Sequence, residues 1–362
     1  MTKLAVLPAV AAVALLAGCP PPPPSVLGAR VPRARGTLRS AQSVYEQHDA
    51  AGLAGVKVDV HAGHVAIKSQ PGSSVLVTGR RVAEGRQQQD LEGWLQMCQV
   101  ELTENPGQGL LLVRDVWPAG VPPWQEADGT VTLELTVEVP LRFSLDANVG
   151  VGSLRAEGEF GELKMHSGVG SLTARTESRE ASLTTGSGNI LWSGVAGPLN
   201  LEAGTGSLTA RGRAADTHLS TDTGDLILEP FDAEGAALLT ATTGAGRIQA
   251  ELTALPARSP EEGAPTATFR AQTGDVLVRF APRPSGSPGE GGARVQATTG
   301  TGSVHTDFSL TRQVETNRGA GGSLTGVLGA GACEVIAGTL TGNITVGPLT
   351  RPHTRASPSA GR

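Results

Sequence analysis

The sequence predicts an all-β protein in which short strands stack as a parallel β-solenoid. Three observations predict it. The 362 residues contain 49 Gly but only six Phe, four Trp and one Tyr. A Gly-x-Gly-(Ser/Asn)-aliphatic unit recurs about ten times, at first in steps of 18 residues. Apolar residues alternate with polar ones on both sides of each unit, which is typical of stacked strands rather than of helices.

The first 18 residues read as a lipoprotein signal peptide. Lys3 supplies a positive start, and the apolar run over residues 4–16 is too short to span a bilayer. Residues 16–19, Leu-Ala-Gly-Cys, match a lipobox, in which cleavage leaves the cysteine as the first residue of the mature chain. Acylation of Cys19 would tether the protein to a membrane, so Cys19 is the predicted lipidation site.

Two segments separate this anchor from the repeats. Residues 19–52 read as the lipidated cysteine and a Pro-rich linker, because five prolines at 20–24 favour an extended stalk. A short helix is expected within the linker near residues 42–47. Residues 53–149 read as a strand-rich N-terminal section that caps or begins the solenoid, with one or two helical turns over 90–97.

The repeats occupy residues 150–346, and residues 347–362 read as a disordered tail. We call each unit of strand, glycine corner and strand a coil, and mark it by its second glycine. The ten marks are Gly152, Gly170, Gly188, Gly206, Gly224, Gly246, Gly274, Gly302, an irregular unit near residue 322, and Gly342.

Side-chain parity predicts which residues of a coil point inward. Aliphatic residues stand two positions after the mark, as at Leu172 and Leu208, and five or seven positions before it, as at Leu183 and Leu201. Each arm therefore alternates with period two, and the phase changes at the corner. Glycine can make this change because it adopts positive φ without steric cost. Stacked coils would then align their inward aliphatics into one narrow core.

The connectors between coils lengthen toward the C-terminus. The steps after the mark at 206 are 18, 22, 28 and 28 residues, and the three insertions fall at 229–235, 253–265 and 281–292. Equivalent connectors of successive coils stack on one edge of a solenoid, so these insertions are expected to protrude side by side and form a recognition rim. The alternative interpretation is that they are tolerated loop tips rich in Pro, Gly, Ser and Glu.

The motif pattern resembles a known family. The run Val137-Glu-Val-Pro-Leu-Arg-Phe143, followed by Gly-x-Gly-Ser-Leu units about 18 residues apart, is similar to the bacterial putative-adhesin β-strand-repeat family of unknown function. The resemblance covers about residues 55–346, and Thr223-Gly-Asp-Leu226 and Thr273-Gly-Asp-Val276 match the family's turn best. It implies a β-solenoid in the cell envelope and supplies no catalytic residue.

Charge and cysteine content limit the partners. Without residues 1–18 the chain has 28 Lys and Arg against 34 Asp and Glu, a net charge of −6. A mildly acidic chain without a basic cluster argues against nucleic acid as a partner. Cys98 and Cys333 remain after Cys19 is lipidated; export permits a disulfide between them, but two buried free thiols fit the sequence better.

No cofactor or metal site is predicted. A dinucleotide fingerprint needs a third glycine at the start of a helix, and here a strand follows Gly-x-Gly. A calcium array needs a carboxylate in nearly every turn, whereas only Asp225 and Asp275 follow the marks. His61 and His64 resemble a metal pair, but residues three apart in a strand face opposite sides, so single exposed histidines are expected.

These features predict a non-catalytic envelope lipoprotein that serves as an adhesin-like scaffold or interaction module. Its expected partners are membrane lipid, through acylated Cys19, and an envelope protein or polysaccharide. The alternative is a carbohydrate-active β-helix enzyme, a polysaccharide lyase or hydrolase. Asp225 and Asp275 would be its carboxylates, about 10 Å apart across the coil marked at Gly246. No catalytic residue is assigned, because both residues are better explained as solvated turn aspartates.

Overall fold

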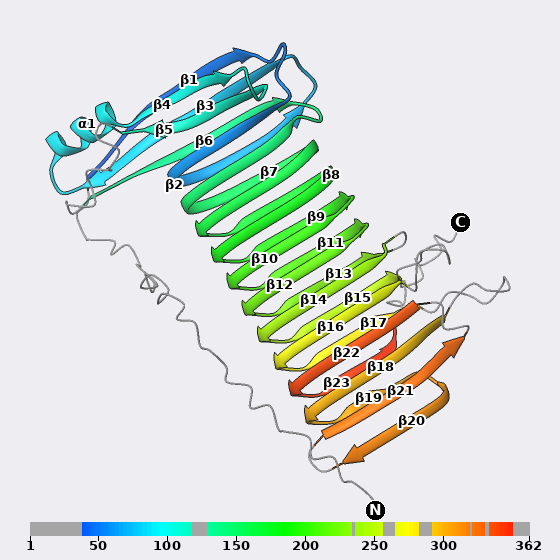
Figure 1. Ribbon diagram of the computed structural model, residues 1–362. Helices are drawn as coiled ribbons and strands as arrows, with labels where there is room; N and C mark the ends of the chain where they lie inside the picture. The colour runs from blue at the N-terminus through cyan, green and yellow to red at the C-terminus, as the bar shows by residue number, and fades with distance from the viewer. Residues whose placement is uncertain are drawn as a thin grey trace, which may run out of the picture. The chain divides into compact units, whose positions relative to one another are not determined.

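The computed structural model describes residues 38–117, 129–233, 236–255, 265–281, 292–318, 321–329 and 333–349. Within them the protein is all-β apart from one helix, α1 (Gln88–Met97), and most neighbouring strands run parallel (Figure 1). The strands are β1 (Leu38–Asp49), β2 (Gly55–Gln70), β3 (Ser74–Gly85), β4 (Gln99–Asn105), β5 (Leu110–Val116), β6 (Thr130–Pro140), β7 (Ser144–Val169), β8 (Leu172–Ser187), β9 (Ile190–Ala196), β10 (Leu199–Thr205), β11 (Leu208–Ala214), β12 (Thr217–Thr223), β13 (Leu226–Asp232), β14 (Leu238–Ala245), β15 (Ile248–Ala254), β16 (Thr266–Thr273), β17 (Val276–Phe280), β18 (Gly292–Thr301), β19 (Val304–Thr306), β20 (Thr311–Arg318), β21 (Gly321–Gly329), β22 (Cys333–Thr341) and β23 (Ile344–Pro348).

Equivalent residues of successive coils lie side by side in parallel register. Before the corner, Leu201 of β10 lies between Leu183 of β8 and Leu219 of β12. After the corner, Leu208 of β11 lies between Ile190 of β9 and Leu226 of β13. The strands before the corners thus form one row and those after the corners form a second row. We call these the pre-corner row and the post-corner row.

The core lies between the two rows, and the predicted parity is confirmed. The inward aliphatics of the middle coils are fully buried, and their outward neighbours are not. The buried residues at the predicted positions include Leu154, Leu163, Leu172, Leu183, Ile190, Leu199, Leu201, Leu208, Leu226, Leu228, Ile248, Phe269, Val276 and Ile344. Burial of each such side chain contributes about 1.5–3 kcal/mol, so many coils together can stabilise what one coil could not.

The stack begins earlier in the chain than the Gly-x-Gly units indicate. β2 pairs with β7 along both of its arms, and Gly63 aligns with the corner glycine Gly152. Val58, five residues before Gly63, and Val65, two after it, are both buried. Gly63 therefore marks a coil that the motif search missed, because His61 stands where the first glycine of the unit is expected.

Close contact between neighbouring coils requires glycine at the corners. Gly170 has φ +152°, and a Cβ built on it would lie 1.6 Å from the carbonyl oxygen of Gly152 in the preceding coil. A hydroxyl three residues before most marks also donates a hydrogen bond of 2.9–3.1 Å to the glycine carbonyl of a neighbouring coil. These pairs are Ser167–Gly152, Thr185–Gly170, Thr221–Gly206, Thr243–Gly224, Thr339–Gly274 and Thr299–Gly342.

The order of the C-terminal coils differs from the order in the sequence. β22 pairs with β16 on one side and β18 on the other, and β23 lies likewise between β17 and β19. The coil marked at Gly342 is therefore inserted between those marked at Gly274 and Gly302 (Figure 1). The prediction of sequential stacking was wrong here, because the chain leaves one position open between β17 and β18 and fills it later with β22 and β23.

The unit near residue 322 does not add a parallel coil either. Its Leu324 is buried as predicted, but β21 runs antiparallel to both β18 and β20. The insertion at 281–292, of which 282–291 lie outside the described residues, joins β17 to β18 past the position occupied by β22. The three insertions follow β13, β15 and β17, which are neighbours in the stack. Residues 234–235 and 256–264 of the other two insertions also lie outside the described residues, so the recognition rim stays a prediction.

One local prediction for the N-terminal part of the chain was wrong. Residues 42–47 are not helical but belong to β1, which pairs antiparallel with β3 over its whole length. The strand therefore begins inside the segment interpreted as linker. The helical turns expected over 90–97 are present as α1, whose Leu91, Trp94 and Leu95 are buried.

Candidate binding groove

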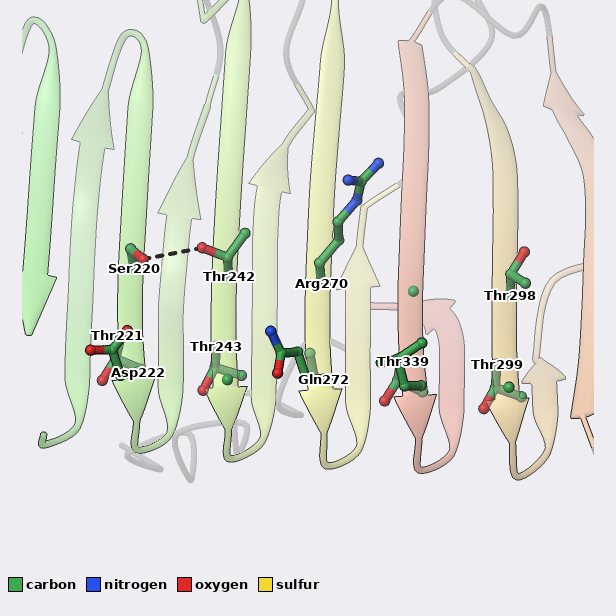
Figure 2. Close-up of a pocket in the computed structure, with 15 residues that line it drawn as sticks. Ser220, Thr221, Asp222, Thr242, Thr243, Arg270, Gln272, Thr298, Thr299 and Thr339 are labelled. Atoms are coloured by element: carbon green, nitrogen blue, oxygen red, sulfur yellow. Dashed lines mark hydrogen bonds between the residues drawn. The ribbon is translucent and has the colours of Figure 1, made fainter. Parts of the chain in front are cut away.

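A groove of about 670 Å³ crosses five parallel strands of the pre-corner row, in the spatial order β12, β14, β16, β22 and β18 (Figure 2). It lies on the side facing away from the core, because its rim consists of the outward positions two and four residues before each mark. The lining residues are Ser220, Thr221, Asp222, Thr242, Thr243, Gly244, Arg270, Ala271, Gln272, Thr298, Thr299, Gly300, Gly338, Thr339 and Leu340.

The floor of the groove consists of buried threonines that are hydrogen-bonded to the corners. Thr221, Thr243, Thr339 and Thr299 are buried, and each donates its hydroxyl hydrogen to a corner glycine carbonyl. Figure 2 shows them as one row near the strand ends. Because these hydroxyl protons already form hydrogen bonds to the corners, they are not available to a ligand. A ligand would instead be recognised by the exposed side chains of the groove.

The upper part of the groove carries the exposed polar side chains. Thr242 donates a 3.3 Å hydrogen bond to Ser220, and Arg270 stands on the next strand (Figure 2). Among the described residues, Arg270 makes neither an ion pair nor a hydrogen bond to an acidic side chain. Asp222 is exposed on the outermost strand of the groove, and the exposed Gln272 adds an amide.

Gly338 opens the centre of the groove. It occupies the position equivalent to Arg270 and Thr298 on the intervening strand β22. A Cβ built on Gly338 would approach no atom closer than 3.9 Å, and that atom is Cγ of Arg270. The glycine is therefore not required by the corner geometry, and its missing side chain leaves a gap between Arg270 and Thr298.

The sequence analysis did not identify this groove. Reading the residues four positions before each mark gives Ser220, Thr242, Arg270, Thr298 and Gly338 in chain order. That set could have shown a polar stripe with one cation. It could not have placed Gly338 beside Arg270, because this neighbour relation depends on the inserted coil.

The two aspartates singled out from the sequence line a smaller cleft of about 250 Å³ on the post-corner row. Arg247 lies between them in the stack. Asp225 accepts hydrogen bonds from the backbone N–H of Arg247 at 2.8 Å and from its guanidinium at 3.3 Å. Asp275 accepts one from the backbone N–H of Asn343 at 2.7 Å. Both carboxylates therefore cap the turn of the next coil, as local Asp side chains commonly do.

The two histidines singled out from the sequence have separate partners. The ring Nδ1 of His61 lies 2.9 Å from Oδ1 of Asp115, and Nδ1 of His64 lies 2.8 Å from Oγ of Ser153. Asp115 is buried and also accepts hydrogen bonds from the His61 backbone N–H and the Trp117 ring N–H. It holds β5 against the first corner, a contact the sequence did not reveal. No group of three His, Cys, Asp or Glu suited to a metal occurs in the part of the chain that the structure describes.

Cys98 and Cys333 are both buried free thiols. Burial and, to a smaller extent, the charges of Asp115 and Glu334, respectively, raise the pKa of each thiol from 9.0 to about 12. We expect neither cysteine to react with iodoacetamide at pH 8 in the folded protein, and both to react in urea. The raised pKa also makes the free energy of unfolding depend on pH. The contribution of the two thiols to that free energy is complete below about pH 9 and is lost as pH rises toward 12. Mass spectrometry of the labelled protein checks the first expectation, and native labelling of either residue would contradict it.

The predicted lipidation site Cys19 lies outside the described residues. Within the described residues, no helix has both the length and the apolar character needed to cross a bilayer.

No protein-family model matches the sequence, and neither does any curated protein. Several solved structures are similar at low identity. A putative adhesin from Parabacteroides distasonis is 10% identical over 85% of this chain and 97% of its own, with a TM-score of 0.30. A putative lipid binding protein from the same species is 7% identical over 86% and 97%, with a TM-score of 0.30. A putative cell adhesion protein from Clostridium sporogenes is 9% identical over 85% and 100%, with a TM-score of 0.26. Values this low assign neither a family nor a ligand to the present chain.

Proposed function

We propose that this protein is a non-catalytic cell-envelope lipoprotein whose β-solenoid serves as an adhesin-like interaction module. The observation that carries the proposal is the polar groove across five strands, built on a floor of buried threonines. A groove with outward hydroxyl, amide and guanidinium groups can hold an extended polar ligand. A rigid stack keeps those groups in place before binding, which lowers the entropic cost of recognition.

The membrane anchor is the part of the proposal that rests on sequence alone. Cys19→Ala is expected to give an unprocessed precursor that carries no lipid, because the thiol is the acceptor of the diacylglyceryl group. Metabolic labelling with a radioactive or alkyne fatty acid, followed by electrophoresis, measures this. Cys98→Ala is the matched control and should be labelled like the natural protein. Normal labelling of the Cys19 variant would show that the anchor lies elsewhere or is absent.

Binding is tested by co-sedimentation of the full chain, in mild detergent, with purified cell-envelope fragments. The natural protein should sediment with the fragments. Gly338→Val should not, because it fills the gap in the groove without meeting an atom closer than 3.9 Å at its Cβ. Gly72→Val is the control, since a Cβ there meets nothing within 4 Å and the residue lies in a turn outside the groove. Equal sedimentation of all three proteins would refute the groove as the binding surface.

The second candidate function is a carbohydrate-active enzyme. The cleft with Asp225, Arg247 and Asp275 favours it, since two carboxylates near a cation suit lyase or hydrolase chemistry. The hydrogen bonds of both carboxylates to turn backbone favour a structural role instead. A release assay on envelope and plant polysaccharides separates the two. Activity that disappears in both Asp225→Asn and Asp275→Asn would establish the enzyme.

A further inference from the structure

Arg270 occupies the middle strand of the groove, with β14 and β12 on one side and β22 and β18 on the other. Its side chain is exposed, in a chain whose formal net charge is −5. Several other arginines are held by acids within the described structure, among them Arg155 by Glu157, Arg179 by Glu162 and Arg279 by Glu251. The guanidinium of Arg270 has no such partner there, and its donors are available to a ligand.

The surroundings of Arg270 restrict the ligand. Guanidinium forms paired hydrogen bonds with a planar carboxylate, and these charge-assisted bonds are stronger than neutral ones. The neighbouring outward groups are hydroxyls, at Thr242 on one side and Thr298 beyond Gly338 on the other, together with the amide of Gln272. Such groups match the many hydroxyls of a sugar. A groove with one cation, Arg270, and an exposed Asp222 two strands away is a poor match for a nucleic acid, which requires several phosphate contacts.

The direction of the groove indicates a polymer rather than a single small molecule. The groove runs across the strands, along the axis on which the coils stack. Five strands at a spacing of about 4.8 Å give it a length of roughly 19 Å. Leu340, 67% exposed, contributes an apolar surface near one end. A ligand strand lying along this axis would contact each β-strand in turn.

We propose that the groove binds a carboxylate-bearing polysaccharide strand, with one sugar carboxylate on the Arg270 guanidinium and neighbouring sugar hydroxyls on Thr242, Gln272 and Thr298. This inference rests on the proposed function, since it names the ligand class of the same groove. Gly338 determines the specificity, because the missing side chain leaves space above β22 for a sugar ring. That space lies between the side chains of Arg270 and Thr298.

The test is a titration of the full-length protein with three probes: tetragalacturonate, neutral maltotetraose and dextran sulfate. Isothermal calorimetry at low salt measures each affinity. We expect tetragalacturonate to bind at least tenfold more tightly than maltotetraose. Arg270→Gln should weaken tetragalacturonate binding about tenfold to a hundredfold, as expected for a lost charge-assisted hydrogen bond, and leave maltotetraose unchanged. Gly338→Val should abolish binding of tetragalacturonate.

Arg279→Gln is the matched control, because it removes an arginine of the post-corner row that pairs with Glu251 outside the groove. It should bind like the natural protein, and thermal unfolding of all variants verifies that they are folded. Equal binding of tetragalacturonate and maltotetraose, or an unaffected Arg270→Gln, would overturn the proposal. Tighter, Arg270-dependent binding of dextran sulfate would overturn the carboxylate assignment. If the titration fails but Gly338→Val still abolishes sedimentation with envelope fragments, only the ligand class is rejected. If the titration fails and sedimentation does not depend on Gly338 either, the proposed function is rejected as well.

Discussion

Leu208→Asp is expected to unfold the protein or to lower its free energy of unfolding by several kcal/mol. Leu208 is fully buried between Ile190 and Leu226 of the neighbouring coils. The substitution removes about 1.5–3 kcal/mol of apolar burial and places a carboxylate where no described side chain can pair with it. Because folded domains are stable by only about 5–15 kcal/mol, this loss should be visible directly in urea denaturation.

Thr209→Asp is the control for this prediction. Thr209 is the next residue on the same strand, and its side chain is partly exposed on the outward side. A carboxylate there remains solvated, so the denaturation midpoint should stay close to that of the natural protein. Similar losses at positions 208 and 209 would contradict the alternation of inward and outward side chains.

Gly170→Ala is expected to be destabilising by more than about 3 kcal/mol, although it adds only one methyl group. The new Cβ would lie 1.6 Å from the carbonyl oxygen of Gly152, and φ at Gly170 is +152°. Backbone strain of this kind costs about 1–3 kcal/mol by itself, and the overlap must in addition push two coils apart. Differential scanning calorimetry would measure the fall in Tm.

Gly338→Ala separates this steric requirement from the general effect of replacing glycine in a strand. Its Cβ would meet no atom within 3.9 Å, and alanine reduces the entropy of the unfolded chain. The variant should therefore melt at or slightly above the temperature of the natural protein. A fall in Tm equal to that of Gly170→Ala would show that the corner geometry is not the cause.

Much of the fold could be predicted because it repeats locally. Alternating burial follows from the pleat of a strand, and the phase change at each mark follows from the conformational freedom of glycine. Both can be read from a few adjacent residues, as around Gly188 and Gly206. The coil at Gly63 shows the limit of this approach. It has the same parity and the same corner, but His61 in place of the first glycine concealed it from a search by motif.

Part of the candidate site could also be predicted, and part could not. Sequence reasoning found that Asp225 and Asp275 share a repeat phase, and the structure places both at turns of the post-corner row. It did not distinguish Arg270 from other surface arginines, because the lack of an acidic partner is a property of spatial neighbours. It also missed the buried carboxylate of Asp115, whose partner His61 lies 54 residues away in the sequence.

The sequence by itself determined the all-β class, the position of most corners and the inward side of each strand, since these depend on interactions between residues close in the chain. Only the tertiary structure decided which coils are neighbours. Coils that share one register offer nearly equivalent edges to one another, so a long connector lets the chain pass one position and fill it later. The chain does so when β22 enters between β16 and β18. That choice sets Gly338 beside Arg270 and so creates the centre of the groove.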